Sequence, residues 1–315
     1  MTMNNRKIVL YAKTETTYGV DPTPSAVDAM LVDMPTIDLI GKKLDRKVVL
    51  PTYGTLAGTN VGEGMKISFN SDLLCSGTAG TAPKLGRLLR ACNMTETVTA
   101  ATKVDYDLNS SQEGESVTFW FFKDGQKYVI NGCVGTVKGN FKANELPTLS
   151  FEFTGIYNAS FASTVALPTP TFGTDTGPFI FRGAAFTFMD LTAPIFESFD
   201  FDLGNEIGKR PNANAASGVE RYFIKARAVK GSIDPEVVAL STFDAWTKWD
   251  QSTPGAISCQ VGSVTGSKCL ITAPNIVLTD APKQADRENI TTYALAWNSY
   301  PTMTAGNNEL KLSFQ

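Results

Sequence analysis

Short runs in which apolar and polar residues alternate recur along this chain, and turn-forming residues separate them. In "MKISFNSDL" (65–73) every second residue is apolar at first, which is the period of a half-buried β-strand. The segment "SVTFWFFKDGQKYVING" (116–132) holds two apolar runs around Asp124-Gly125, a pair typical of a tight β-hairpin. Another alternating run, "PTLSFEFTGIY" (147–157), follows. The pattern predicts a mainly β fold with short connections.

A helix interrupts the first set of strands, and the same order of elements then returns. Apolar residues at 85, 88, 89 and 92 have helical spacing. In the second half, a strand over 221–233 precedes a short helix over 241–251, for which Ser241 or Thr242 is the candidate N-cap. A hairpin around Thr265-Gly266 and a strand over 291–300 follow. This order predicts a diverged internal duplication.

The fold class that we expect is mainly β with short helices. It consists of two duplicated β-sandwich or barrel domains, each with a flanking α-helix. The first domain covers residues 1–160 and includes an extended N-terminal arm. A linker over 161–178 has the Pro, Thr, Gly and Ser content of a connecting segment, and the second domain covers 179–315.

The most decisive count is that of histidine, which is zero in 315 residues. It excludes Ser-His-Asp and Cys-His nucleophile systems and most zinc catalysis. No phosphate-binding, dinucleotide-binding, nucleophile-elbow or calcium-loop motif is present. We therefore expect no catalytic residues, no cofactor and no metal. A formal charge of −3 gives no basic field for gripping nucleic acid.

Five cysteines without C-x-x-C spacing lie in or beside apolar runs, and we expect them to be reduced core thiols. We also expect three tryptophans in the core rather than on a carbohydrate-binding platform: Trp246, Trp249 and Trp297. No apolar run approaches the ~20 residues of a membrane span and no secretory signal is apparent. We expect a soluble protein made in the cytoplasm.

Two stretches carry a family resemblance: "AKTETTYGVDPTPS" (12–25) and "SGTAGTAPKLGRLLRACNM" (76–94). They resemble the opening of the major tail tube proteins of long-tailed, siphophage-like bacteriophages. The resemblance implies a non-enzymatic virion protein that forms stacked rings around a channel for DNA. It also implies contact with the tape measure, tail terminator and distal tail proteins, no membrane partner, and assembly in the host cytoplasm. Two similar domains in one chain favour a trimeric ring with pseudo-sixfold symmetry, and a true hexamer is the alternative.

The resemblance also implies bridging roles for three segments. The N-terminal arm would become ordered only against a neighbouring subunit, and its two prolines suit an extended backbone. Two loops would bridge adjacent rings. The arm residues are Thr14, Glu15, Tyr18, Asp21, Pro22 and Pro24, and the loop residues are Tyr53, Thr55, Leu56, Val61, Pro211, Asn212 and Asn214.

Three other functions stay open on the residues alone. The first is a β-sandwich ligand-binding or adhesin module, and the second is a hydrolase that uses paired carboxylates. The third is the tube protein of a contractile tail or of a secretion apparatus.

Overall fold

The computed structural model describes residues 6–173, 180–304 and 306–315. Strands hold 52% of the residues and helices 5%, which confirms the predicted mainly β class. The helical elements are a 3-10 turn, η1 (Ala26–Asp28), and two short helices, α1 (Gly86–Ala91) and α2 (Ala245–Asp250). Residues 174–178 of the predicted linker lie outside the described residues.

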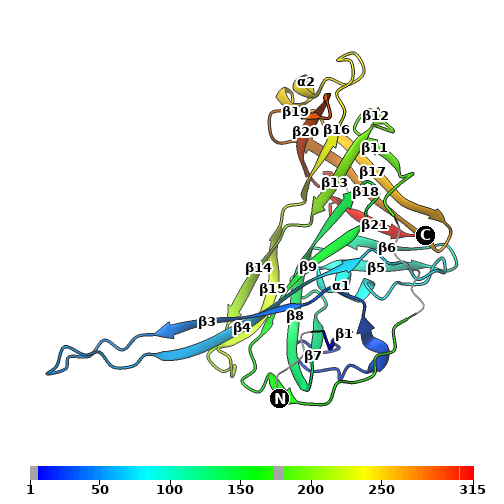
Figure 1. Cartoon of the computed structure of the whole chain (residues 1–315). Coiled ribbons are helices and arrows are strands. Elements are labelled where there is room, and N and C mark those ends of the chain that lie inside the picture. Colours follow the sequence, from blue (N-terminus) through cyan, green and yellow to red (C-terminus); the bar gives the residue numbers. More distant parts are fainter. Residues whose placement is uncertain (1–5, 174–179, 305) are drawn as a thin grey trace.

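Six antiparallel strands form the frame of the first half (Figure 1). In spatial order they are β3 (Thr36–Leu44), β4 (Thr59–Asp72), β9 (Thr148–Ile156), β8 (Gln126–Lys142), β7 (Val117–Lys123) and β1 (Ile8–Thr14). The predicted hairpin joins β7 to β8. Its turn residues Asp124 and Gly125 both have positive φ, +36° and +97°, as a two-residue hairpin turn that follows the strand twist requires. Two short strands, β2 (Ala29–Met30) and β10 (Ala162–Thr164), add to β1 and to the start of β8.

The second half has the same strand order. Its strands are β13 (Phe196–Asp202), β16 (Lys230–Pro235), β20 (Ile290–Ser299), β18 (Ser267–Leu278), β17 (Gly255–Val264) and β11 (Ala185–Phe188). The predicted hairpin joins β17 to β18, with Val264 opposite Ser267. β12 (Leu191–Thr192) pairs with β11, and β19 (Lys283–Arg287) pairs with β20. The strand order of the second half thus matches that of the first, and the internal duplication itself stays a prediction.

Each half also has a long hairpin that extends from the first two strands of its spatial order. In the first half, β3 and β4 project far from the body (Figure 1). In the second half, strand β13 is interrupted at Leu203-Gly204, where Gly204 has a φ of +62°. After this interruption, β14 (Asn205–Pro211) pairs with β15 (Val219–Arg227).

One hairpin has no counterpart in the second half. β5 (Met94–Thr99) and β6 (Lys103–Leu108) follow α1, and the C-terminal strand β21 (Lys311–Phe314) pairs with both β6 and β18. In the second half only four residues separate α2 from β17, so no such hairpin fits there. The sequence analysis missed these three strands. The alternation in "LKLSF" (310–314) signals a strand, but not its partners.

Alternation along the strands separates a buried face from a polar face. Met65, Ile67 and Phe69 of β4 are buried, whereas Lys66 and Asn70 are exposed, as a half-buried strand requires. All five cysteines are buried and none forms a disulfide, which confirms their predicted state as core thiols.

Two expectations for α2 are wrong. The N-cap is Asp244, whose side chain accepts a hydrogen bond from Thr247 N at 3.0 Å, rather than Ser241 or Thr242. Trp297 is buried, but Trp246 and Trp249 are 43% and 37% exposed. The helix begins later than the periodicity indicated and lies on the surface, so only Ala245 within it is buried.

Candidate assembly interface

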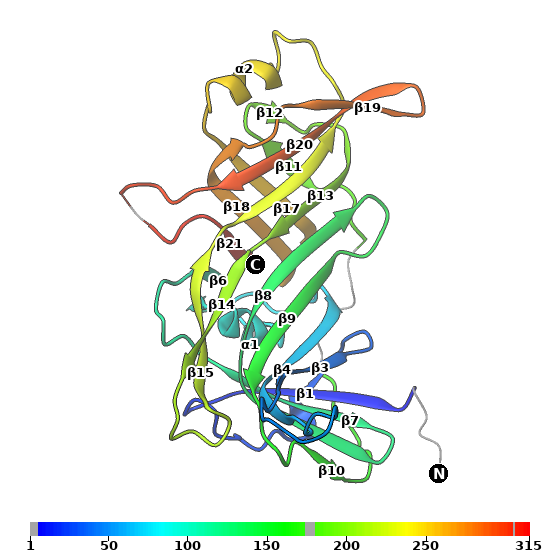
Figure 2. The same ribbon diagram turned by 90° about the vertical axis from the view of Figure 1, so that its left-hand side faces the viewer.

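A continuous sheet joins the two halves of the chain. The C-terminal part of β8 pairs antiparallel with β13, and Lys138 lies opposite Asp202 and Lys142 opposite Ser198. In Figure 2, β9, β8, β13, β16 and β20 run side by side across this junction. We call the β8–β13 pairing and the contacts around it the internal joint.

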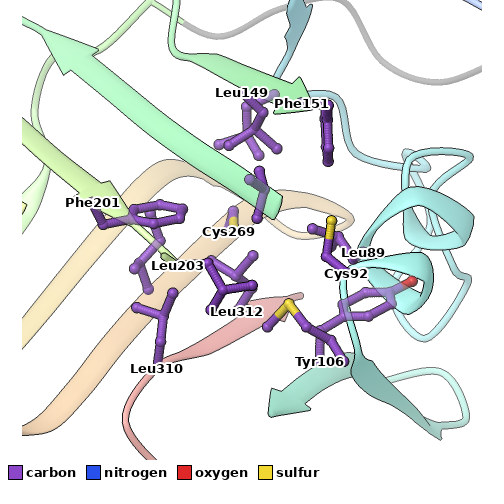
Figure 3. Close-up of a cluster of buried hydrophobic side chains, with 14 of the residues drawn as sticks. Leu89, Cys92, Tyr106, Leu149, Phe151, Phe201, Leu203, Cys269, Leu310 and Leu312 are labelled. Atoms are coloured by element: carbon purple, nitrogen blue, oxygen red, sulfur yellow. The ribbon is translucent and has the colours of Figure 1, made fainter. Parts of the chain in front are cut away.

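A hydrophobic core lies behind the internal joint (Figure 3). From the first half come Leu89 of α1 and Phe151 of β9, and from the second half Phe201 of β13, Leu203 and Leu312 of β21. All five are buried. Burying side chains of this size stabilises the contact by about 1.5–3 kcal/mol each. The two halves are thus held by a shared core as well as by backbone hydrogen bonds.

The β14–β15 hairpin is bound to the first half of the chain by side-chain contacts. The Tyr18 hydroxyl donates to Gly132 O at 2.9 Å and accepts from Tyr222 N at 2.6 Å, and the guanidinium of Arg221 lies 4.5 Å from the centre of the Tyr18 ring. Burial raises the pKa of Tyr18 above its usual value. At the base of the hairpin, Asn205 Nδ2 donates to the carbonyl oxygen of Cys92, at the end of α1. One tyrosine and one asparagine therefore link the hairpin to β8 and α1.

β3 and β19 are two of the edge strands of the joined sheet, since each has a single neighbour among the described strands. β3 pairs only with β4, and β19 pairs only with β20. These edges occupy the positions that β13 and the end of β8 occupy at the internal joint. The pairing of β3 shifts its register after Ile40, and β13 ends at Asp202. When the two halves are aligned at these two points, Leu39 takes the position of Phe201. Leu39 is 57% exposed and Phe201 is 1% exposed.

The outward face of the joined sheet is polar, and its charges are largely paired. Lys66 Nζ lies 2.7 Å from Glu152 Oε1, and Lys138 Nζ lies 3.1 Å from Asp202 Oδ2. Burial raises the pKa of Asp200, although Ser232 donates hydrogen bonds to it. The strand registers place further charges of both signs on this face: Asp38, Lys142, Lys230, Asp234 and Lys283. Small neutral side chains lie among them: Ser68, Asn70, Ser150, Thr136, Asn140, Ser198, Ala294 and Ala296.

In the described ranges, no group of three or more His, Cys, Asp and Glu side chains is placed to hold a metal ion. Of the helices that the structure describes, none has the length and apolar content needed to cross a membrane.

A protein-family comparison decides the class. The model of the phage tail tube protein family matches residues 5–299. The chain belongs to this family. No curated protein matches the chain. The family is one of structural virion proteins, and the match runs across the internal joint, from the first half of the chain into the second as far as residue 299.

In this tail tube protein, the predicted arm begins inside the chain's own core. Glu15 is 9% exposed. Its carboxylate accepts hydrogen bonds from Ser116 Oγ at 2.6 Å, Thr118 Oγ1 at 2.5 Å, Gly132 N at 2.7 Å and Gly19 N at 2.7 Å. Glu15 is thus fixed within one chain.

The expectation that the arm becomes ordered only against a neighbour is wrong for Glu15, Tyr18 and Asp21, because side chains and backbone of β7, β8 and β15 hold them. Asp21 Oδ2 accepts from Trp120 Nε1 at 3.0 Å. Thr14 ends β1, where Arg90 donates to its hydroxyl, and Pro22 is half-buried and Pro24 buried. Contacts of these residues with another subunit stay a prediction.

The predicted loop residues lie at the two hairpin ends. Tyr53, Thr55 and Leu56 are exposed in the connection between β3 and β4. Val61 lies in β4 opposite Lys42, and Pro211 ends β14. Two further predicted residues, Asn212 and Asn214, form the turn that follows, where Asn214 N donates to Asn212 Oδ1 at 2.9 Å. The structure therefore groups them into two hairpin tips.

One glutamate ties the two long hairpins together. Glu63 of β4 lies 2.7 Å from Lys42 Nζ of β3 and 2.5 Å from Lys209 Nζ of β14. The hydrogen bonds from Lys209 and Lys42 lower its pKa from 4.5 to about 2. Sequence reasoning did not find this glutamate, because its partners come from hairpins that are far apart in the chain.

Glu63→Gln is expected to loosen β14–β15 in a pH-dependent way. A lowered folded-state pKa means that the contribution is complete above pH 4.5 and is lost as the pH falls through about 2. Hydrogen exchange over 205–227 should therefore be faster in the variant than in the parent at pH 6. The difference should vanish near pH 2. Glu220→Gln, at the exposed end of the same hairpin, is the control, and an equal difference at both pH values would contradict the assignment.

Proposed function

We propose that copies of this chain join head to tail into rings, and that the rings stack into the tube of a phage tail. One observation carries the proposal: β8 and β13 form a complete contact at the internal joint, and the same sheet ends in two open edges that correspond to its two sides. β3 is the counterpart of β13, and β19 is the counterpart of the end of β8. Unpaired edges invite another strand. In a closed ring every such edge is used, because the contact is heterologous and its rotation closes.

Three copies are the natural number for such a ring. Each chain supplies two counterpart domains, 1–160 and 179–315, so that three chains give six similar units with pseudo-sixfold symmetry. Three joints are then internal and three lie between subunits. A ring of six chains is the alternative.

The hairpin tips are suited to contacts between rings. The β3–β4 tip carries exposed apolar side chains, among them Val49, Tyr53 and Leu56. We assign inter-ring contacts to this tip and to the turn at 211–214, and contacts with neighbouring subunits to the exposed parts of 14–24. These contacts would order the tips.

The polar face of the sheet supports a lining role. Paired charges and small neutral side chains offer no basic surface to which DNA phosphates would adhere. In the proposed tube, DNA passes along this face without specific binding, and the tape measure protein occupies the channel before it. Tail terminator and distal tail proteins cap the tube, and assembly takes place in the host cytoplasm. No catalytic role, cofactor or metal is part of the proposal.

Cross-linking between the open edges tests the ring. The internal register places Lys138 opposite Asp202. Ala285 pairs with Thr292 of β20 as Lys138 pairs with Ser150 of β9, so the counterpart register places Ala285 opposite Ile40. The chain carrying Ile40→Cys and Ala285→Cys is expected to give covalent dimers and closed trimers with a short bis-maleimide during assembly. The five natural cysteines are buried and supply a low background. Asp38→Cys in place of Ile40→Cys scans the neighbouring register.

Single-cysteine variants set the control level. If tubes form but neither double variant cross-links above that level, the β3–β19 joint is wrong. A ladder that continues to six chains would replace the trimer by the hexamer. A parent chain that stays monomeric at high concentration would overturn the assembly itself.

A further inference from the structure

Four large apolar side chains in α2 and in the segment before it are exposed. Val238 is 37% exposed, Leu240 61%, Trp246 43% and Trp249 37%. Trp249 Nε1 donates to Thr279 O at 3.2 Å. Thr279 lies between β18 and β19, so this indole stands beside the open edge of the sheet. We call these four residues the α2 face.

The counterpart of α2 in the first half is covered. α1 occupies the same place in the repeat, after β4 and before the β7–β8 hairpin, as α2 does after β16 and before β17–β18. Leu89 of α1 and Cys92 after it are fully buried, and they belong to the core to which Phe201 and Leu203 of the second half contribute (Figure 3). α1 packs against β1, β5, β6, β7 and β8 of its own half. At the internal joint the second half adds a contact at the end of this helix, where Asn205 Nδ2 donates to Cys92 O. In the part of the chain that the structure describes, Trp246 and Trp249 of α2 stay exposed.

We infer that the α2 face is a subunit contact, covered by the first domain of a second copy of this chain around its Leu39. The inference rests on the proposed ring. Pairing of β3 with β19 brings Leu39 to the place where Phe201 stands at the internal joint. The α2 face then continues that contact, as the region of α1 continues the internal one.

The first domain has an apolar groove beside the start of β3. This groove, of about 450 Å³, is lined by Ile8, Met30, Leu31 and Met34, among others. Leu31 and Met34 are 49% and 52% exposed. At the internal joint the second residue of β13, Glu197, accepts the Ala143 backbone NH at its carbonyl oxygen. The groove and Leu39 are thus suited to an apolar partner that arrives with the β19 edge.

The character of the face fits a contact between subunits. Tryptophan is enriched among the residues that dominate binding energy at interfaces, where it is desolvated at the centre of the contact.

Acrylamide quenching of tryptophan fluorescence tests the inference directly. The other two tryptophans are buried or half-buried, and the variant carrying Trp246→Phe and Trp249→Phe reports their share. In the unassembled chain the parent should be quenched more strongly than this variant. In purified tubes the parent should fall to the level of the variant. Tubes in which both tryptophans stay as accessible as in the free chain would overturn the inference.

A second measurement uses assembly itself. Trp249→Ala is expected to raise the critical concentration for tube formation by more than about tenfold, the effect of losing an interface hot spot. The matched control is Val98→Ala, because Val98 is 52% exposed on β5, a strand without a counterpart in the second half. Normal assembly of Trp249→Ala beside a functional parent contradicts this inference alone. Failure of the parent to form rings contradicts the proposed function instead.

Discussion

Phe201→Ala is expected to lower the free energy of unfolding by about 3–5 kcal/mol, the usual cost of removing a buried phenylalanine. The Phe201 ring is 1% exposed and is stacked on Phe141 of β8, with 6.0 Å between the ring centroids. Its edge also covers Gly139, where a β-carbon would come within 2.3 Å of the ring. Truncation leaves a cavity at the internal joint. Urea denaturation of the unassembled chain measures the loss.

Leu39→Ala is the matched variant, and it should behave in the opposite way. Leu39 holds the counterpart position but is exposed, so its truncation should change the stability of the single chain by no more than about 0.5 kcal/mol. Ring and tube formation should be impaired, which sedimentation and negative-stain electron microscopy can follow. Equal destabilisation by the two variants, or normal tubes from Leu39→Ala, would contradict the view that the two positions are counterparts.

Glu15→Ala is expected to cost about 3–5 kcal/mol of unfolding free energy, because the hydroxyls of Ser116 and Thr118 and the Gly132 NH lose their acceptor while buried. Each unsatisfied buried donor costs about 1–3 kcal/mol. The segment 15–21 should also exchange its amide hydrogens faster. Both effects follow from one carboxylate that serves four donors.

Thr16→Ala is the control for Glu15, since Thr16 is exposed next to it. A loss below about 1 kcal/mol for Glu15→Ala would be too small for even one such donor. In that case the segment would not depend on this carboxylate, and the expectation of a loosely held arm would return.

Local patterns in the sequence were enough to predict the elements whose structure depends on residues close to one another in the chain. Asp124-Gly125 and Thr265-Gly266 sit in hairpin turns, the alternation over 65–69 follows a half-buried strand, and Leu88 and Leu89 lie on a buried helix. The family resemblance was also confirmed, since the family model covers both halves. Period and turn chemistry act over a few residues, and they determine these features without distant contacts.

Pairings between distant strands could not be predicted in this way. β21 pairs with β6, and Ser313 Oγ donates to Asp105 Oδ1 at 2.6 Å across 208 positions. The carboxylate of Glu309 likewise pairs with Arg227, with a closest approach of 2.9 Å. The site residues divide in the same way. Glu15 was singled out as part of an arm, but its partners come from β7 and β8, and Glu63 was missed altogether.

The unmatched β5–β6 hairpin has a consequence for how such a filament would look. In a ring of three chains it occurs three times, although the sheet is built from six similar units. The six units could therefore pass for identical around the channel, while the outer wall would carry three ridges. Image averaging with imposed sixfold symmetry would blur these ridges, and averaging with threefold symmetry would sharpen them.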